Sequence, residues 1–269
     1  MFAELNSYIG FNEDNPPNPG HLILVTDSLT DGSFLIHHFL SLFLKGGHNV
    51  CFLALAQSFS HYNAVAQKLG INLSSSRDSG QLTFVNGLDF SLQLMHAVTD
   101  SSQHDEPVAL QCLRDETATI QPLYNIIREA STPKQGDLEN AETRLLLIDN
   151  LSVLISLGLS IQQVMQFVHY CQASQPNATI ACLVHHDTDI DDESNASLVT
   201  QLRHRAHCLL QVQGLGSGFS KDVHGQLKII KREPDGTRPS RNQPDRTLQY
   251  KILDKTVTFF AVGTSSAVL

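Results

Sequence analysis

The stretch from residue 22 to residue 47, LILVTDSLTDGSFLIHHFLSLFLKGG, constrains the fold more than any other part of the chain. It predicts an apolar strand, a polar turn that contains glycine, a long amphipathic helix and a glycine pair that ends the helix. A strand that leads through such a turn into a helix is the local architecture of a phosphate-binding loop, because the helix start offers unpaired N–H groups and the positive end of its dipole. This turn is therefore the first candidate site.

The residues of the turn do not supply the chemistry of a nucleotide site. When the pattern G-x-x-x-x-G-K-[ST] is laid on it, Asp27 stands at the first glycine and Gly32 at the second. Ser33 takes the position of the lysine that neutralises the β- and γ-phosphates, and Phe34 takes that of the hydroxyl that binds magnesium. Asp27 and Asp31 would bring carboxylates towards a polyanion. We therefore expect no ATP hydrolysis here, no metal and no cofactor.

Two interpretations of this turn remain open. The residues can be a degenerate phosphate loop, or they can form an ordinary strand-to-helix turn in which Asp31 or Ser33 caps the helix. Taken alone, the stretch favours the second interpretation.

A second strand, at 144–149 (RLLLID), ends in an acid. Four consecutive apolar residues predict a parallel strand buried on both faces, with Asp149 at its carboxyl end. In a phosphate-loop enzyme such an acid orients magnesium and water. Asp149, Asn150 and Ser152 can equally well cap the helix that follows.

The rest of the chain predicts an α/β fold with a mostly parallel sheet flanked by helices and finished by antiparallel strands. Short apolar runs predict strands at 50–55, 81–85 and 178–185, and helical patterns lie at 60–69, 88–98, 122–130 and 161–172. Later strands joined by polar turns are predicted at 207–213, 223–231, 248–253 and 257–262. Residues 1–20 are expected to form an arm and linker, and residues 21–269 a single domain.

Composition excludes several classes of protein. No apolar run reaches the roughly 18 residues that span a bilayer, and no signal peptide is expected in the first 20 residues, so we expect an intracellular chain without a membrane partner.

The loop 185–192 is rich in His and Asp, but contiguous acids repel one another and do not predict a metal site. Scattered cysteines without a C-x-x-C pair predict reduced, buried thiols at Cys51, Cys112, Cys171, Cys182 and Cys208.

The charge of the chain is distributed unevenly. Residues 1–202 hold 7 of the 18 Lys and Arg and 22 of the 27 Asp and Glu, which gives a net charge of −15. Residues 203–269 hold 11 basic and 5 acidic residues, a net charge of +6. The end of this acidic chain is basic, although a solvated surface explains such an asymmetry unless the fold gathers those residues.

The order of elements over residues 21–262 resembles the RecA-like ATPase core. Five runs are similar to the family of sixth subunits of the eukaryotic Elongator complex, and they lie at 30–41, 51–70, 145–158, 217–229 and 250–263. The resemblance implies a heterohexameric ring with the fourth and fifth Elongator subunits, two copies of each. It further implies docking on the catalytic Elongator subcomplex, tRNA binding and support for wobble-uridine modification, in the cytoplasm and, as a second compartment, the nucleus. Members of this kind lack an intact phosphate loop.

The resemblance also suggests roles for basic residues. Lys231 and Arg232 are expected near a subunit boundary, although a solvated strand end explains them as well. Arg203, Arg205 and Lys221 flank or lie in the glycine-rich loop 213–222 and are candidates for tRNA contact, unless they only balance the acids of the 187–193 loop. Two other functions stay open, an active RecA-type ATPase and a DNA-binding protein of the recombination-mediator kind.

Overall fold

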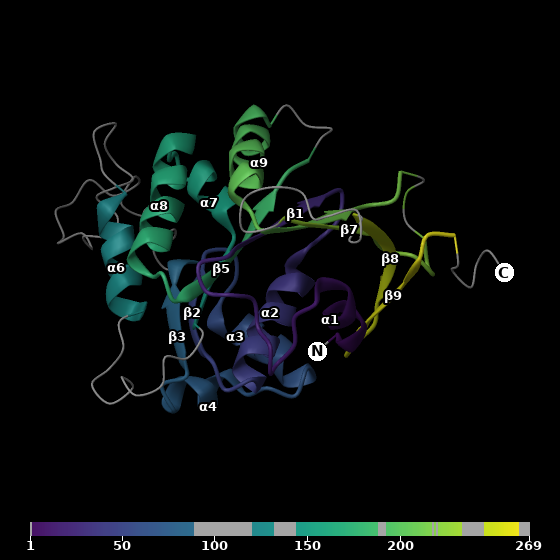
Figure 1. Cartoon of the computed structure of the whole chain (residues 1–269), viewed down its shortest axis with the longest axis horizontal. Coiled ribbons are helices and arrows are strands. Elements are labelled where there is room, and N and C mark those ends of the chain that lie inside the picture. The colour runs from purple at the N-terminus through teal and green to yellow at the C-terminus, as the bar shows by residue number, and fades with distance from the viewer. Residues whose placement is uncertain are drawn as a thin grey trace.

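The fold is a sheet with helices on both faces (Figure 1). A computed structural model describes residues 2–88, 120–131, 144–187, 192–216, 218, 220–232 and 245–263. Within these ranges, nine strands form one sheet in the order β3-β2-β4-β5-β1-β6-β7-β8-β9. The predicted α/β architecture is confirmed.

The first six strands are parallel and the last three complete the sheet in antiparallel fashion. We call the edge where the parallel strands end the carboxyl edge, and the opposite one the amino edge. The strands are β1 (Leu22–Ser28), β2 (Asn49–Ala54), β3 (Leu82–Asn86), β4 (Arg144–Asp149), β5 (Ala178–His185), β6 (Cys208–Gln213), β7 (Gly225–Lys231), β8 (Arg246–Ile252) and β9 (Val257–Ala261).

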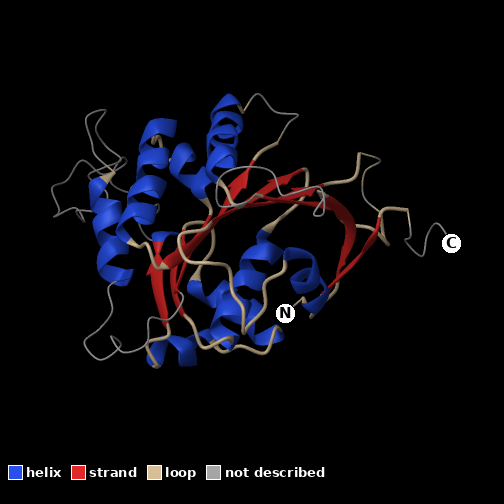
Figure 2. Ribbon diagram, in the orientation of Figure 1, coloured by secondary structure: helices blue, strands red, loops and turns tan. Residues whose placement is uncertain are grey.

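Helices cover the two faces and create two separate apolar cores (Figure 2). One face carries α1 (Ala3–Ile9), α2 (Ser33–Lys45), α3 (Phe59–Lys68) and α4 (Leu73–Asp78). The other face carries α6 (Gln121–Ser131), α7 (Leu151–Ser156), α8 (Ile161–Ser174) and α9 (Glu193–Arg205). None of these described helices is long and apolar enough to cross a bilayer.

The helix α2 is not amphipathic as predicted, because every residue from 34 to 44 is buried. The sheet curls round it (Figure 2), so that α1 and the antiparallel strands cover the side that the sequence assigns to solvent. His37, His38 and Ser41 therefore lie in the core, although in the sequence they look like the polar face of an amphipathic helix.

The sequence missed one helix, α9, and for that reason it also assigned β6 the wrong direction. The sequence predicted no helix at 193–205, because only Leu198, Val199 and Leu202 give α9 an apolar stripe. This helix is the crossover that returns the chain to the amino edge, so β6 runs parallel to β1. The sequence grouped β6 with the antiparallel strands.

Other segments need smaller corrections. The sequence predicted no element between the helix at 60–69 and the strand at 81–85, but the short helix α4 lies there, and Asn72 caps its start. The helix predicted at 88–98 lies almost entirely outside the described residues.

The described cysteines confirm the prediction of buried, reduced thiols. Cys51, Cys171, Cys182 and Cys208 are free and buried. Burial raises the pKa of the Cys51 thiol to about 11, so it stays protonated at neutral pH. Cys112 lies outside the described residues.

Candidate functional site

The turn between β1 and α2 is filled by carboxylates of the chain itself. Asp27 is buried, and its Oδ2 accepts a hydrogen bond of 2.8 Å from the Gly32 N–H. The Asp31 carboxylate accepts hydrogen bonds from the N–H and the hydroxyl of Ser33, at 2.8 Å and 2.9 Å. Two N–H groups that a bound phosphate would use at a helix start therefore already have anionic partners.

Gly32 allows this close approach. A Cβ atom on Gly32 would lie 3.0 Å from the Asp27 Cβ and 3.2 Å from its Oδ2. Because Gly32 has no side chain, the carboxylate of Asp27 can come close enough to accept a hydrogen bond from the Gly32 N–H.

Phe34 anchors the start of α2 in the core. Its ring centroid lies 5.0 Å from that of Tyr250 on β8 and 6.2 Å from that of Phe2. The Tyr250 hydroxyl in turn lies 3.2 Å from the hydroxyl of Thr30 in the turn. The residue at the position of the magnesium-binding hydroxyl is thus a core residue.

His185, the last residue of β5, pairs with Asp27 from the neighbouring strand. The His185 Nδ1 lies 2.5 Å from the Asp27 Oδ1. This hydrogen bond raises the pKa of His185, and partial burial opposes it. The His185 N–H also donates to the Ser152 hydroxyl at 2.9 Å. Asp27 therefore ties β1, the start of α2 and β5 together.

Asp149 lies at the end of β4, as the sequence predicts, but its carboxylate is held by a tyrosine. The Tyr62 hydroxyl of α3 donates to the Asp149 Oδ2 at 2.6 Å. Burial raises the pKa of Asp149 to about 6. The helix cap that follows is Asn150, whose side chain accepts from the Val153 N–H.

Lys231 and Arg232 lie at the amino edge, away from the turn, because β7 runs antiparallel to β6. The Lys231 Nζ lies 5.8 Å from the centroid of the Phe11 ring, and burial lowers the pKa of this lysine. Arg232 Nη1 donates to the His204 carbonyl at 3.0 Å. Both side chains therefore make contacts within the chain.

The three candidate tRNA contacts are not brought together. Arg203 and Arg205 end α9 at the amino edge, and α9, with 13 residues, is about 20 Å long. Lys221 follows the end of β6 at the carboxyl edge, in the connection whose Gly214 N–H donates to the Ser28 carbonyl. Lys221 thus lies on the side of the phosphate-type turn, and the two arginines on the opposite side.

The loop after β5 does not gather ligands in its described part. Asp187 accepts a hydrogen bond from the Leu29 N–H at 2.7 Å, while His185 faces Asp27. Within the described residues, no group of three His, Cys, Asp or Glu side chains is placed to hold a metal ion.

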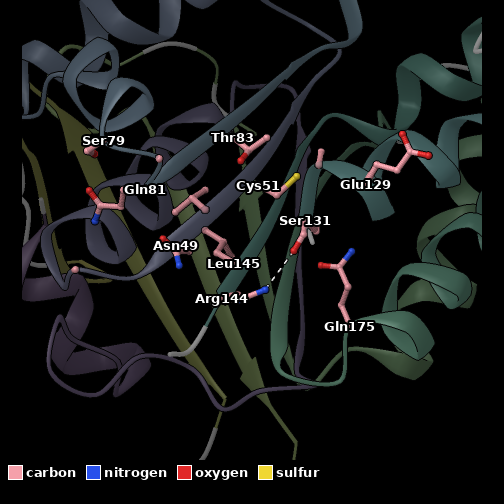
Figure 3. Close-up of a pocket in the computed structure, with 14 residues that line it drawn as sticks. Asn49, Cys51, Ser79, Gln81, Thr83, Glu129, Ser131, Arg144, Leu145 and Gln175 are labelled. Atoms are coloured by element: carbon pink, nitrogen blue, oxygen red, sulfur yellow. Dashed lines mark hydrogen bonds between the residues drawn. The ribbon is translucent and has the colours of Figure 1, made fainter. Parts of the chain in front are cut away.

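A cavity of about 720 Å³ opens at the amino edge beside β2, β3, β4 and α6 (Figure 3). Its wall includes the Arg144 guanidinium, which donates to the Ser131 carbonyl at 3.2 Å, and the side chains of Asn49, Gln81 and Gln175. Ligands of open α/β sheets bind at the carboxyl ends of the strands, so this cavity is not part of the candidate turn.

Three residues of the site escape sequence reasoning. Tyr62, His185 and Tyr250 supply the contacts that fix Asp149, Asp27 and Thr30. His185 had a usable signal, since it ends a buried strand and so reaches the carboxyl edge. Tyr62 and Tyr250 had none, because their partners are 87 and 220 residues away in sequence.

The strand order, the turn after β1 and the antiparallel completion define a RecA-like protein. The fold is similar to that of the flagellar accessory protein FlaH from Methanocaldococcus jannaschii, with a TM-score of 0.58, 14% identity and coverage of 95% of this chain and 94% of that one. The profile of the family described as Elongation complex protein 6 matches residues 2–254. The chain is 46% identical over 272 residues to Elongator complex protein 6 of Xenopus laevis and 44% over 273 residues to that of Homo sapiens, with 100% of each chain covered. It therefore belongs to the Elongator complex protein 6 family, and the predicted resemblance is confirmed.

Proposed function

We propose that this chain is a non-catalytic subunit of the Elongator accessory ring. It assembles with the fourth and fifth Elongator subunits, two copies of each, and the ring docks on the catalytic subcomplex. The ring supports tRNA binding and the modification of wobble uridines, and the chemistry belongs to other subunits. Family membership supports the place in Elongator, and it favours an accessory role.

The observation that carries the non-catalytic role is the pair of carboxylates in the turn. A phosphate at the start of α2 would have to displace Asp31 from the Ser33 N–H and approach Asp27. Two like charges 4 Å apart repel by about 1 kcal/mol in water and about 4 kcal/mol at the effective dielectric of a protein surface. No lysine at position 33 offsets this repulsion. The turn is therefore described best as a degenerate phosphate loop.

An ATP turnover assay on the co-expressed ring tests this role. Ser33→Ala in this chain is expected to leave the turnover rate unchanged, because the Ser33 hydroxyl donates to Asp31 and serves no phosphate. Ser160→Ala is the control, since Ser160 is also a serine at a helix start whose hydroxyl donates to a neighbouring side chain, in this case Gln163 at the start of α8. A drop in turnover with Ser33→Ala and none with Ser160→Ala would restore the alternative of an active ATPase.

A further inference from the structure

Carboxylates gather at the carboxyl edge near the start of α9, and cations gather where α9 ends at the amino edge. Acids gather towards the carboxyl edge, at Asp27, Asp31, Asp149, Asp187, Asp192 and Asp222. The helix α9 starts beside that edge with Asp192 and Glu193 and ends at the amino edge with Arg203, His204 and Arg205. The fold thus places the basic residues of the end of the sequence at both edges. Arg203, Arg205 and Arg232 lie at the amino edge, and Lys221 lies at the carboxyl edge.

The segments that build the amino edge next to α9 contain no carboxylate. Residues 161–177, 194–213 and 223–232 have no Asp or Glu, in a chain with 27 of them. Arg232 reaches the His204 carbonyl, and Arg205 Nη2 donates to Gln172 at 2.9 Å, beside His169. Arg203 is exposed and makes no hydrogen bond or ion pair with the part of the chain that the structure describes. Nothing in these segments neutralises the guanidinium groups.

Flat rings lie beside these cations. His21 and His207 stack with their centroids 4.4 Å apart and their planes within 5°, and both are only half-buried. Tyr170, the neighbour of His169, is 43% exposed. Arginines next to partly exposed rings suit nucleic acid that offers both phosphates and unpaired bases, because the rings stack on bases while the guanidinium groups bind the backbone.

We propose that this amino-edge patch, formed by Arg203, Arg205, Arg232, His204, His207 and Tyr170, is where the chain contacts RNA. The arginines hold the sugar–phosphate backbone, and the rings stack on unpaired bases. The inference rests on the proposed function of the ring in tRNA binding, and it moves the contact away from Lys221. An acidic protein segment would satisfy the arginines but would leave the rings without partners. The acids of the carboxyl edge repel a polyanion, so they favour orientations in which the amino edge faces the RNA.

Fluorescence anisotropy with labelled tRNA and the intact co-expressed ring tests the patch. Arg203→Glu is expected to weaken binding about tenfold and to reduce the slope of log K against log salt by about one unit, because one phosphate contact is lost. Lys221→Glu is the matched control, since it makes the same change of charge on an exposed side chain at the other edge. It is expected to change the affinity less than twofold.

The possible results distinguish a failure of the amino-edge patch from a failure of the proposed function. Equal losses for both variants, or an unchanged affinity with Arg203→Glu in a ring that binds tRNA, would overturn the patch and leave the proposed function intact. Displacement of the tRNA by polyglutamate as effective as displacement by unlabelled tRNA would assign the patch to an acidic protein and overturn it as well. A wild-type ring that binds no tRNA would instead overturn the proposed function. The mass of each variant ring is measured first, so that lost assembly is not counted as lost binding.

Discussion

Replacing Asp27 by alanine is expected to lower the free energy of unfolding by about 3 kcal/mol, because it leaves the buried Gly32 N–H and the ring of His185 without their partner. The Asp27 side chain is only 2% exposed, and it holds the Gly32 N–H and the His185 ring at once. Asp27→Asn keeps an oxygen for Gly32 and loses the charge, so a smaller loss is expected. Denaturation of the co-expressed ring at fixed protein concentration measures both changes.

The pH dependence identifies the partner of Asp27. The hydrogen bond to Asp27 raises the pKa of His185, so the folded chain binds this proton more tightly than the unfolded chain. The stabilisation is complete below the ordinary pKa of 6.5 and is lost as the pH rises through the raised pKa of the folded state. His185→Gln is expected to remove this loss at high pH. A pH profile that is the same in wild type, Asp27→Asn and His185→Gln would show that the pair contributes nothing.

Acidification from pH 7 to pH 5 is expected to destabilise the chain through His38, with about 2 kcal/mol lost at this residue. Burial lowers the pKa of His38 from 6.5 to about 3, so the folded state excludes a proton that the unfolded state binds. Stability therefore rises with pH up to about the ordinary pKa. The ring of His38 stacks on Phe2 at 5.3 Å, and neither of its nitrogens has a hydrogen-bond partner in the described structure.

His38→Leu isolates this contribution. It removes two buried nitrogens at similar volume, so it is expected to reduce the loss between pH 7 and pH 5 by about 2 kcal/mol. His37 adds to the acid sensitivity of both the wild type and the His38→Leu variant, since burial lowers its pKa to about 4. Asp149 acts in the opposite sense, because burial raises its pKa to about 6. Parallel pH profiles for wild type and His38→Leu would contradict the buried, neutral state of His38.

The parallel core of the fold follows from local patterns, which explains why the sequence predicted it. Runs such as 144–149 are apolar on both faces, and only a strand covered by two helical layers buries both. The helix α9 and the burial of α2 were not predictable in this way. Polar residues cover most of α9, and α2 is enclosed by strands that lie more than 180 residues later in the chain.

The candidate turn was predictable as a position, but its contacts were not. Asp27, Gly32, Ser33 and Phe34 follow from matching one pattern to one stretch of sequence. The pair between Asp27 and His185 joins residues 158 positions apart and depends on the register of β1 with β5. The basic residues show the same limit, since sequence distance placed Arg205 and Lys221 together and α9 with β6 separates them.

Native mass spectrometry of the chain co-expressed with the fourth and fifth Elongator subunits tests the central claim most directly. A RecA-like ring subunit exposes apolar flanks when its neighbours are absent, so the chain alone is expected to aggregate and to melt at a lower temperature than in the assembly. The expected species contains two copies of each of the three subunits. A stable, soluble monomer of this chain that stays unbound in the presence of both partners would contradict the assignment as a ring subunit.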